Sequence, residues 1–220
     1  MVIDHNFREY RRRWEQAGKN KYNGAFYYSK EIVKNIIPNV RTDRNWITVN
    51  IPGVGVDHSI LFIHNNLHPE HYDWIRDKGF KDVVLICGIP ETVEKVAHLG
   101  KAVYLPLSID TEYVKQFRTE KTKGAAFIGR PAKRKGLTLP EGIDIIEGLP
   151  RPQLLKAMAQ YDTVYAVGRT ALEAKALGCK LKPYDPRFPK VSRWKVVDNL
   201  KAAEMLQELL DEIDGPHKAD

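Results

Sequence analysis

Short apolar segments recur along the chain and alternate with longer segments of mixed polarity. The apolar segments are rich in β-branched and aromatic residues, and Gly, Pro or Asn flanks many of them, which is typical of buried strands. Because they are apolar throughout, they favour parallel sheets covered by helices on both faces. The expected strands are Ile47–Ile51, Ile60–His64, Val83–Cys87, Ala102–Leu105, Ala125–Ile128, Ile143–Ile146, Thr163–Val167 and Cys179–Lys182.

Helix-like segments separate these strands, and the class expected is therefore α/β. The helices expected between strands are Tyr28–Ile36, Glu70–Lys78, Pro90–Leu99, Pro152–Gln160 and Thr170–Leu177. A long amphipathic helix is expected at Val196–Ile213, where apolar residues recur at spacings of three and four.

A polar connection, Pro106 to Thr122, is the best boundary between two halves of the 220-residue chain. We therefore expect an N-terminal Rossmann-like domain at 1–107 and a second domain at 108–195. Residues 196–220 would form a C-terminal packing helix and a frayed tail.

The formal net charge of +7 favours anionic partners such as nucleotides, phosphates, nucleic acid or anionic lipid. Lys115 to Gly136 contains eight basic residues and one acid, so this segment carries as much net charge as the whole chain. A solvated loop is the alternative explanation of such a run.

The start of the chain and its two cysteines bear on its location. The first residues lack the apolar core of a secretory signal, and no apolar run approaches the roughly 18 residues of a membrane span. Cys87 and Cys179 lie far apart in apolar surroundings. We therefore expect a reduced, cytoplasmic protein without a membrane span.

Candidate chemistry is sought directly after the strands, because parallel sheets bind ligands beyond their carboxyl ends. His64 follows one strand, and its reference pKa of about 6.5 suits a general base. The alternative is a turn residue before a helix. His64, His68 and His71 do not predict a metal site, because Pro69 interrupts them and no acid or thiol has matching spacing.

A second candidate follows the strand that ends at Ile128. Gly129 lets the backbone approach a ligand, Arg130 offers a fork of donors matched to phosphate oxygens, and Lys135 adds a mobile positive charge. The segment is not a P-loop, since the pattern GxxxxGK[ST] is absent.

A third candidate follows the strand that ends at Val167. Gly168, Arg169 and Thr170 open a helix, and a helix N-terminus attracts anions. Glu173 has two interpretations, which the sequence leaves open. It either closes a capping box with Thr170 or accepts hydrogen bonds from a ribose diol.

The second half, roughly Pro106 to Pro189, resembles the nucleotide-sugar domain of GT-B glycosyltransferases. The stretches FIGRPAKRKG, LPRPQLLKAMAQYDTVYAVG and GRTALEAKALGCKL match, in order, the strand with Gly-Arg and Lys-Gly, the helix and next strand, and the Glu-containing helix. In that family the Arg and Lys of the first stretch hold the donor diphosphate, here Arg130 and Lys135. The Glu holds the ribose, here Glu173, and the preceding turn touches phosphates, here Gly168, Arg169 and Thr170.

The resemblance implies two Rossmann-like domains whose parallel sheets face a central cleft. It places His64 after a strand where some members have a polar residue on the acceptor side. The chain departs from the family in two respects. Tyr165 stands where many retaining members carry a second Glu, and the N-terminal half is short.

The function expected is a metal-independent glycosyltransferase, of the hexosyltransferase type, that uses a nucleotide-diphosphate sugar and no cofactor. No Asp-x-Asp motif is present, which disfavours a metal-dependent GT-A enzyme. The alternatives are a non-catalytic nucleotide or nucleotide-sugar binder and a nucleic-acid binder that uses the basic segment at 115–136. A DNA acceptor would combine the first and last of these.

Overall fold

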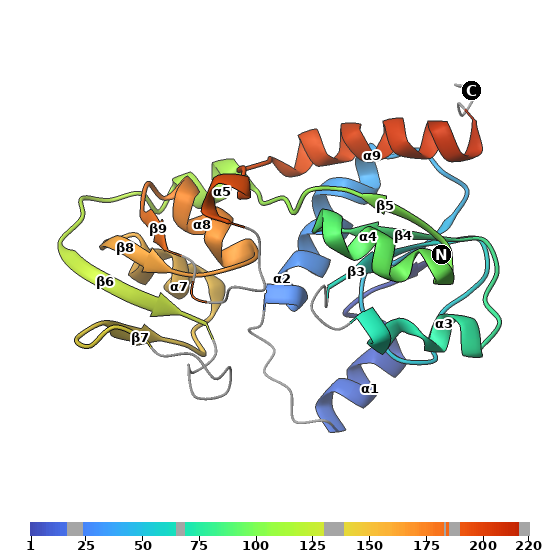
Figure 1. Cartoon of the computed structure of the whole chain (residues 1–220), viewed down its shortest axis with the longest axis horizontal. Helices are drawn as coiled ribbons and strands as arrows, with labels where there is room; N and C mark the ends of the chain where they lie inside the picture. Colours follow the sequence, from blue (N-terminus) through green and yellow to red (C-terminus); the bar gives the residue numbers. More distant parts are fainter. Residues whose placement is uncertain (17–23, 65–68, 130–138, 183, 185–189, 216–220) are drawn as a thin grey trace. The chain divides into compact units, whose positions relative to one another are not determined.

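The computed structural model describes residues 1–16, 24–64, 69–129, 139–182, 184 and 190–215. The chain divides into two compact units. The first consists of residues 1–21, 25–107 and 199–220, and the second of residues 22–24 and 108–198. Each unit has its own parallel sheet and its own helices (Figure 1). The α/β class is therefore confirmed.

The sheet of the first unit follows the order of the chain, β1-β2-β3-β4-β5, and every pair is parallel. Its strands are β1 (Val2–Ile3), β2 (Asn45–Ile47), β3 (Ser59–Ile63), β4 (Val83–Cys87) and β5 (Lys101–Tyr104). Its helices are α1 (Arg8–Gln16), α2 (Gly24–Glu31), η1 (Ile32–Ile36), η2 (Ile37–Asn39), η3 (Pro69–Tyr72), α3 (Trp74–Asp77), α4 (Pro90–Val96), η4 (Ala97–Leu99) and α9 (Asn199–Asp214).

The central strands of this sheet are buried on both faces. Residues of β3 and β4 at alternate positions, such as Leu61 and Leu85, pack with Tyr72, Ile75 and Val96 from the crossover segments. On the opposite face the ring of Phe62 contacts those of two other buried residues, Trp46 and Tyr28. This two-sided burial explains the continuous apolar runs in the sequence.

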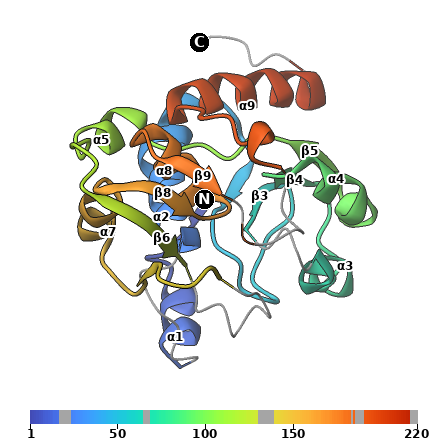
Figure 2. The same cartoon turned by 60° about the vertical axis from the view of Figure 1, so that its left-hand side comes forward.

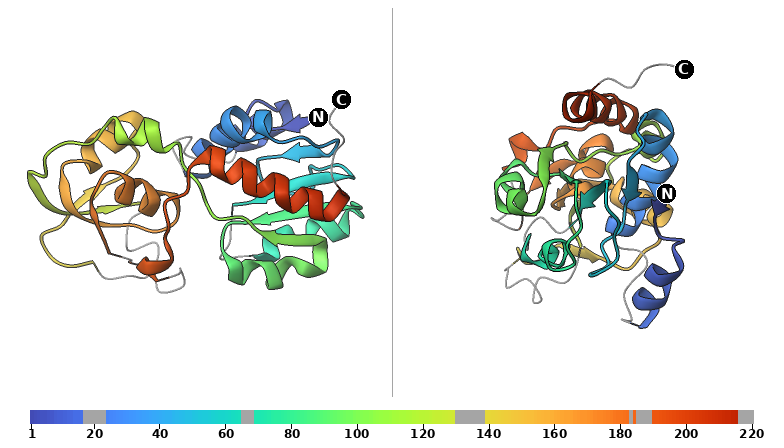
Figure 3. Two further views of the ribbon diagram at one scale, coloured as in Figure 1. Left: turned by 90° about the horizontal axis from the view of Figure 1, so that it is seen from above. Right: turned by 90° about the vertical axis from the view of Figure 1, so that its right-hand side faces the viewer.

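The C-terminal helix α9 belongs to the first unit, where it packs along η1 (Figure 3). Its buried apolar positions include Leu206 and Leu210. Asn199 at its start donates a 2.8 Å hydrogen bond to Glu31. Residues far apart in the sequence, 25–107 and the segment after 198, thus form one unit.

The sheet of the second unit has the order β7-β6-β8-β9, again with parallel pairs only (Figure 2). Its strands are β6 (Lys123–Ile128), β7 (Asp144–Ile146), β8 (Tyr161–Tyr165) and β9 (Lys180–Lys182). Its described helices are α5 (Thr111–Lys115), α7 (Arg151–Met158), α8 (Arg169–Ala176) and η5 (Val191–Arg193). The strand order reverses between β6 and β8, because β6 leads outward to β7 and β8 leads the other way to β9.

Each expected strand has a counterpart in the structure, with ends that differ by up to four residues. The strand that the sequence did not indicate is β1, whose two residues are too few for a recognisable pattern. None of the helices in the described ranges is long and apolar enough to cross a membrane.

Candidate functional site

The point where strand order reverses in the second unit is the first candidate position for a ligand. β6 and β8 are hydrogen-bonded neighbours, and the chain leaves their carboxyl ends in opposite directions. Crevices at such points are the usual ligand sites of open α/β sheets. Gly129 directly follows β6, and Gly168 lies three residues beyond the end of β8.

Both glycines have backbone conformations that disfavour other residues. Gly168 has φ 64° and ψ −144°, and a Cβ atom there would meet no atom within 4 Å. Its backbone conformation, rather than lack of space, therefore requires glycine. Gly129 has φ 150°, and a Cβ atom there would lie 3.3 Å from the Tyr184 hydroxyl. Tyr184 thus contributes a hydroxyl group close to the end of β6.

Helix α8 begins at Arg169, and Gly168 is its N-cap. The capping box that would join Thr170 to Glu173 is therefore wrong. Thr170 is the second residue of the helix, and the N-cap makes no side-chain hydrogen bond. The positive φ of Gly168 turns the chain into the helix before Thr170 is reached, which leaves Glu173 for another role.

Glu173 instead lies between two buried arginines. Its Oε1 is 3.1 Å from Nη2 of Arg151 and 3.4 Å from Nη2 of Arg169. All three side chains are only 6% exposed. Arg151 is the first residue of α7, and its guanidinium lies 5.6 Å from the ring centroid of Tyr113 on α5. The cluster therefore joins α5, α7 and α8.

Arg151 was not among the expected site residues, although the sequence carries a signal for it. Arginine at the first position of a helix opposes the helix dipole, which favours acids there and bases at the other end. Both α7 and α8 begin with arginine and have no acid in the first turn. A cation in this position, placed between Pro150 and Pro152, indicates a role other than helix stability.

Five of the expected site residues lie in the segments that follow the carboxyl ends of β6 and β8 in the second sheet. They are Gly129, Gly168, Arg169, Thr170 and Glu173. Arg130 and Lys135 lie outside the described residues. His64 belongs to the first unit.

His64 follows β3 and is held by several neighbours. Its Nε2 donates a 2.7 Å hydrogen bond to the carbonyl oxygen of Thr48, and its backbone N–H approaches the Tyr72 hydroxyl at 3.0 Å. Its ring packs edge-on against Tyr28, with 5.8 Å between centroids. A carbonyl only accepts, so in neutral His64 the proton sits on Nε2 and Nδ1 carries the lone pair. Nδ1 is therefore the atom of this imidazole that can accept a proton.

Part of the basic segment caps helices. Arg118 Nε donates to the carbonyl of Ala176 at 2.7 Å, and Lys121 Nζ donates to those of Ala159 and Leu177 at 2.7 and 2.9 Å. These carbonyls lie at the C-terminal ends of α7 and α8, where cations are favourable.

The other two basic residues that the structure describes in this segment also have neighbours. Lys115 pairs with Glu112 at 2.7 Å, and Lys123 lies over the ring of Tyr161. Arg130 and Lys133–Lys135 lie outside the described residues. The described part of the segment therefore has structural roles.

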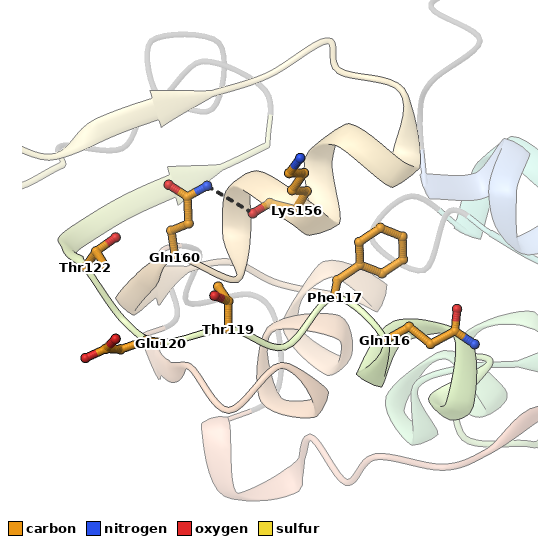
Figure 4. A pocket seen from close by; sticks show the side chains of 7 residues that line it. All are labelled: Gln116, Phe117, Thr119, Glu120, Thr122, Lys156 and Gln160. Atoms are coloured by element: carbon orange, nitrogen blue, oxygen red, sulfur yellow. Dashed lines mark hydrogen bonds between the residues drawn. The ribbon is translucent and has the colours of Figure 1, made fainter.

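A pocket of about 400 Å³ lies at the opposite ends of the strands of the second sheet (Figure 4). Thr122 precedes β6 and Gln160 precedes β8, so the pocket is at the amino ends of the strands. It is lined by Gln116, Phe117, Thr119, Glu120, Thr122, Lys156 and Gln160. The residues expected at the carboxyl ends do not line it.

Within the described ranges, no group of three His, Cys, Asp or Glu side chains is placed to hold a metal ion. Cys87 and Cys179 are buried free thiols in different units. Burial raises the pKa of the Cys87 thiol to about 12. No family model, curated protein or solved structure matches the chain.

Proposed function

We propose that the second unit binds a nucleotide-diphosphate sugar at the carboxyl ends of β6 and β8, and that the protein transfers the sugar to an acceptor as a metal-independent glycosyltransferase. The observation that carries the proposal is the reversal of strand order at β6 and β8, with Gly129 and the start of α8 directly beyond it.

The chemistry at this edge suits a diphosphate leaving group. The first backbone N–H groups of α8 have no partner within the helix, and the positive end of the helix dipole lies there. Gly168 has no side chain to shield these groups, and Arg169 adds a guanidinium at the same helix start. The resemblance to GT-B enzymes adds Arg130 and Lys135. Such fixed donors would stabilise the negative charge that develops as the glycosidic bond to phosphate breaks.

The acceptor side of the proposal assigns His64 Nδ1 as the general base. The hydrogen bond from Nε2 to Thr48 fixes the ring and its tautomer, so Nδ1 carries the lone pair that would take a proton from an acceptor hydroxyl. Transfer requires a GT-B-like arrangement in which the two units face each other across a cleft, and that arrangement is part of the proposal.

Thermal unfolding with a series of nucleosides, nucleoside diphosphates and nucleotide sugars tests the donor site. We expect a nucleoside diphosphate at about 100 times its dissociation constant to stabilise the protein by roughly 2.7 kcal/mol. The matching nucleoside should stabilise much less, because the proposed contacts are to phosphate. Equal shifts from nucleoside and diphosphate would contradict the phosphate site.

The His64→Ala variant tests the catalytic assignment. It should keep its affinity for the nucleoside diphosphate, while hydrolysis or transfer of the nucleotide sugar falls about 10²- to 10⁴-fold. Unchanged turnover would remove His64 from the mechanism. Diphosphate binding without any turnover of a nucleotide sugar would favour the non-catalytic binder instead.

The nucleic-acid alternative makes a different prediction. Duplex DNA binding that weakens steeply with salt, together with no effect of nucleotides, would support it. The helix-capping roles of Arg118 and Lys121 count against it, because those two cations already bind carbonyls.

A further inference from the structure

We propose that Glu173 does not bind the ribose but holds two arginines, Arg151 and Arg169, as a pair that binds the diphosphate, so that Arg151 is a second phosphate-binding residue. This inference rests on the nucleotide site proposed above. It assigns Glu173 a positioning role and adds Arg151 to the groups that contact the ligand.

The first argument is the geometry around Glu173. Both guanidinium groups approach the same atom, Oε1, at 3.1 and 3.4 Å. Both contacts are ion pairs between buried groups, where opposite charges attract more strongly than they do in water. A ribose diol that took over this oxygen would replace two ionic contacts with neutral ones. The carboxylate is therefore better suited to holding arginines than to accepting ribose hydroxyls.

The second argument is the position of the arginines. Arg151 and Arg169 are the first residues of α7 and α8, and their two guanidinium groups approach one carboxylate. These positive groups repel one another, and a diphosphate bound beside them would offset that repulsion. Guanidinium forks also match the spacing of phosphate oxygens.

The third argument is that Arg151 is held in place from two sides. Glu173 contacts its Nη2, and the ring of Tyr113 faces its Cζ at 5.6 Å. Arginines stack on aromatic rings in this way while their edge donors contact another group. Such fixing lowers the entropy lost when a ligand binds, because the side chain is already ordered.

The test compares ligands that differ in the ribose. We would titrate the original protein and the Glu173→Gln variant calorimetrically with inorganic pyrophosphate and with a nucleoside diphosphate. If Glu173 positions the arginines, both affinities fall by the same factor, about 10- to 100-fold. If Glu173 accepts ribose hydroxyls, the affinity for the nucleoside diphosphate falls while the affinity for pyrophosphate does not. That result, or unchanged affinity for both ligands, would overturn the inference.

Arg151→Lys provides a second variant in case Glu173→Gln does not fold. It keeps the positive charge but loses the fork, so we expect weaker binding of both ligands and a melting temperature near that of the original protein. Unchanged binding of pyrophosphate by this variant would exclude Arg151 from the site. Glu112→Gln is the matched control, because it removes an exposed carboxylate that pairs with Lys115 in the same unit. It should leave both affinities unchanged.

The original protein separates this inference from the proposed function. If it binds neither pyrophosphate nor any nucleoside diphosphate, the nucleotide site itself is wrong and the inference falls with it. If it binds both ligands and the variants keep the original affinity for pyrophosphate, the nucleotide site stands and only the roles of Glu173 and Arg151 are wrong.

Discussion

Each unit buries arginine in a small ionic cluster. The cluster of the first unit lies at the amino ends of its strands, and that of the second unit lies at the carboxyl ends. In the first unit Arg44 directly precedes β2 and is 3% exposed. It donates to both carboxylate oxygens of Asp214 at 2.6 and 2.7 Å, and to Asp82 at 3.0 Å. In the second unit Arg151 and Arg169 follow β7 and β8, at the carboxyl ends of the strands. One cluster therefore lies where ligands rarely bind, and the other where they usually do.

The two clusters also differ in their balance of positive and negative side chains. Carboxylates surround Arg44, and a third one, Asp43, reaches the network through His58, whose ring nitrogens lie 2.5 Å from Asp82 and 3.0 Å from Asp43. In the second unit two arginines approach one carboxylate oxygen. The first cluster thus ties α9 to the ends of two strands, whereas the second has more cations than anions, and the proposed function assigns it an anionic ligand.

The two clusters also differ in the backbone conformations beside them. His58 and Asp82, which both lie in the first cluster, have φ values of 50° and 52° although neither is glycine. Such conformations persist where the surroundings over-determine them. In the second unit the unusual conformation at the start of α8 belongs to Gly168. At His58 and Asp82 ion pairs hold the strained backbone, whereas at the start of α8 glycine avoids the strain.

The largest effect should come from Arg44→Met. Removing the guanidinium leaves Asp214 and Asp82 without their common partner, and breaking a buried ion pair in this way costs about 3 kcal/mol or more. We expect urea unfolding to show that loss, while nucleoside diphosphate affinity stays unchanged. Arg12→Ala is the control, since it removes an exposed pair with Glu9 and should cost no more than about 1 kcal/mol. Loss of nucleotide affinity in Arg44→Met would break the proposed division of roles.

Gly168→Ala should have an intermediate effect. The alanine has space, but it must adopt a backbone conformation that costs a non-glycine residue about 1–3 kcal/mol. We expect a lower melting temperature and weaker diphosphate binding, because the start of α8 must shift. Gly124→Ala in β6 is the control. Its Cβ also meets no atom within 4 Å and its φ is not positive, so stability should stay level or rise. Equal losses in the two variants would contradict the argument for Gly168.

The smallest effect should be the pH dependence due to His58. Hydrogen bonds to Asp82 and then Asp43 raise the pKa of His58 above its ordinary value of about 6.5. The stabilisation is therefore fully present below about pH 6.5 and is lost as the pH rises through the higher pKa of the folded protein. Because the side chain is 42% exposed, we expect a loss below about 1 kcal/mol.

Urea unfolding from about pH 5.5 to about pH 9 measures this loss. The His58→Gln variant should lack the decline in this range. Stability that rises with pH in the original protein, or an identical decline in the variant, would show that His58 does not brace the first cluster.

The sequence by itself determined the α/β class and the strands that follow one another along the chain. Two-sided burial makes each central strand a continuous apolar run, and that signal is local. It also placed Gly129 and Gly168 shortly after strands, because a glycine that follows an apolar run is visible without knowing the fold.

Only the tertiary structure decided which residues meet. The second sheet follows the order β7-β6-β8-β9 and the first follows the chain, although both arise from similar alternations of strand and helix. Glu173 was indicated as a cap or a ribose acceptor, but its ionic partner Arg151 lies 22 positions earlier, and Arg44 finds Asp214 across 170 positions. Hydrophobic periodicity records whether a position is buried, but not its neighbours. The partners of a buried charge are set by strand order and helix packing, which depend on contacts between distant parts of the chain.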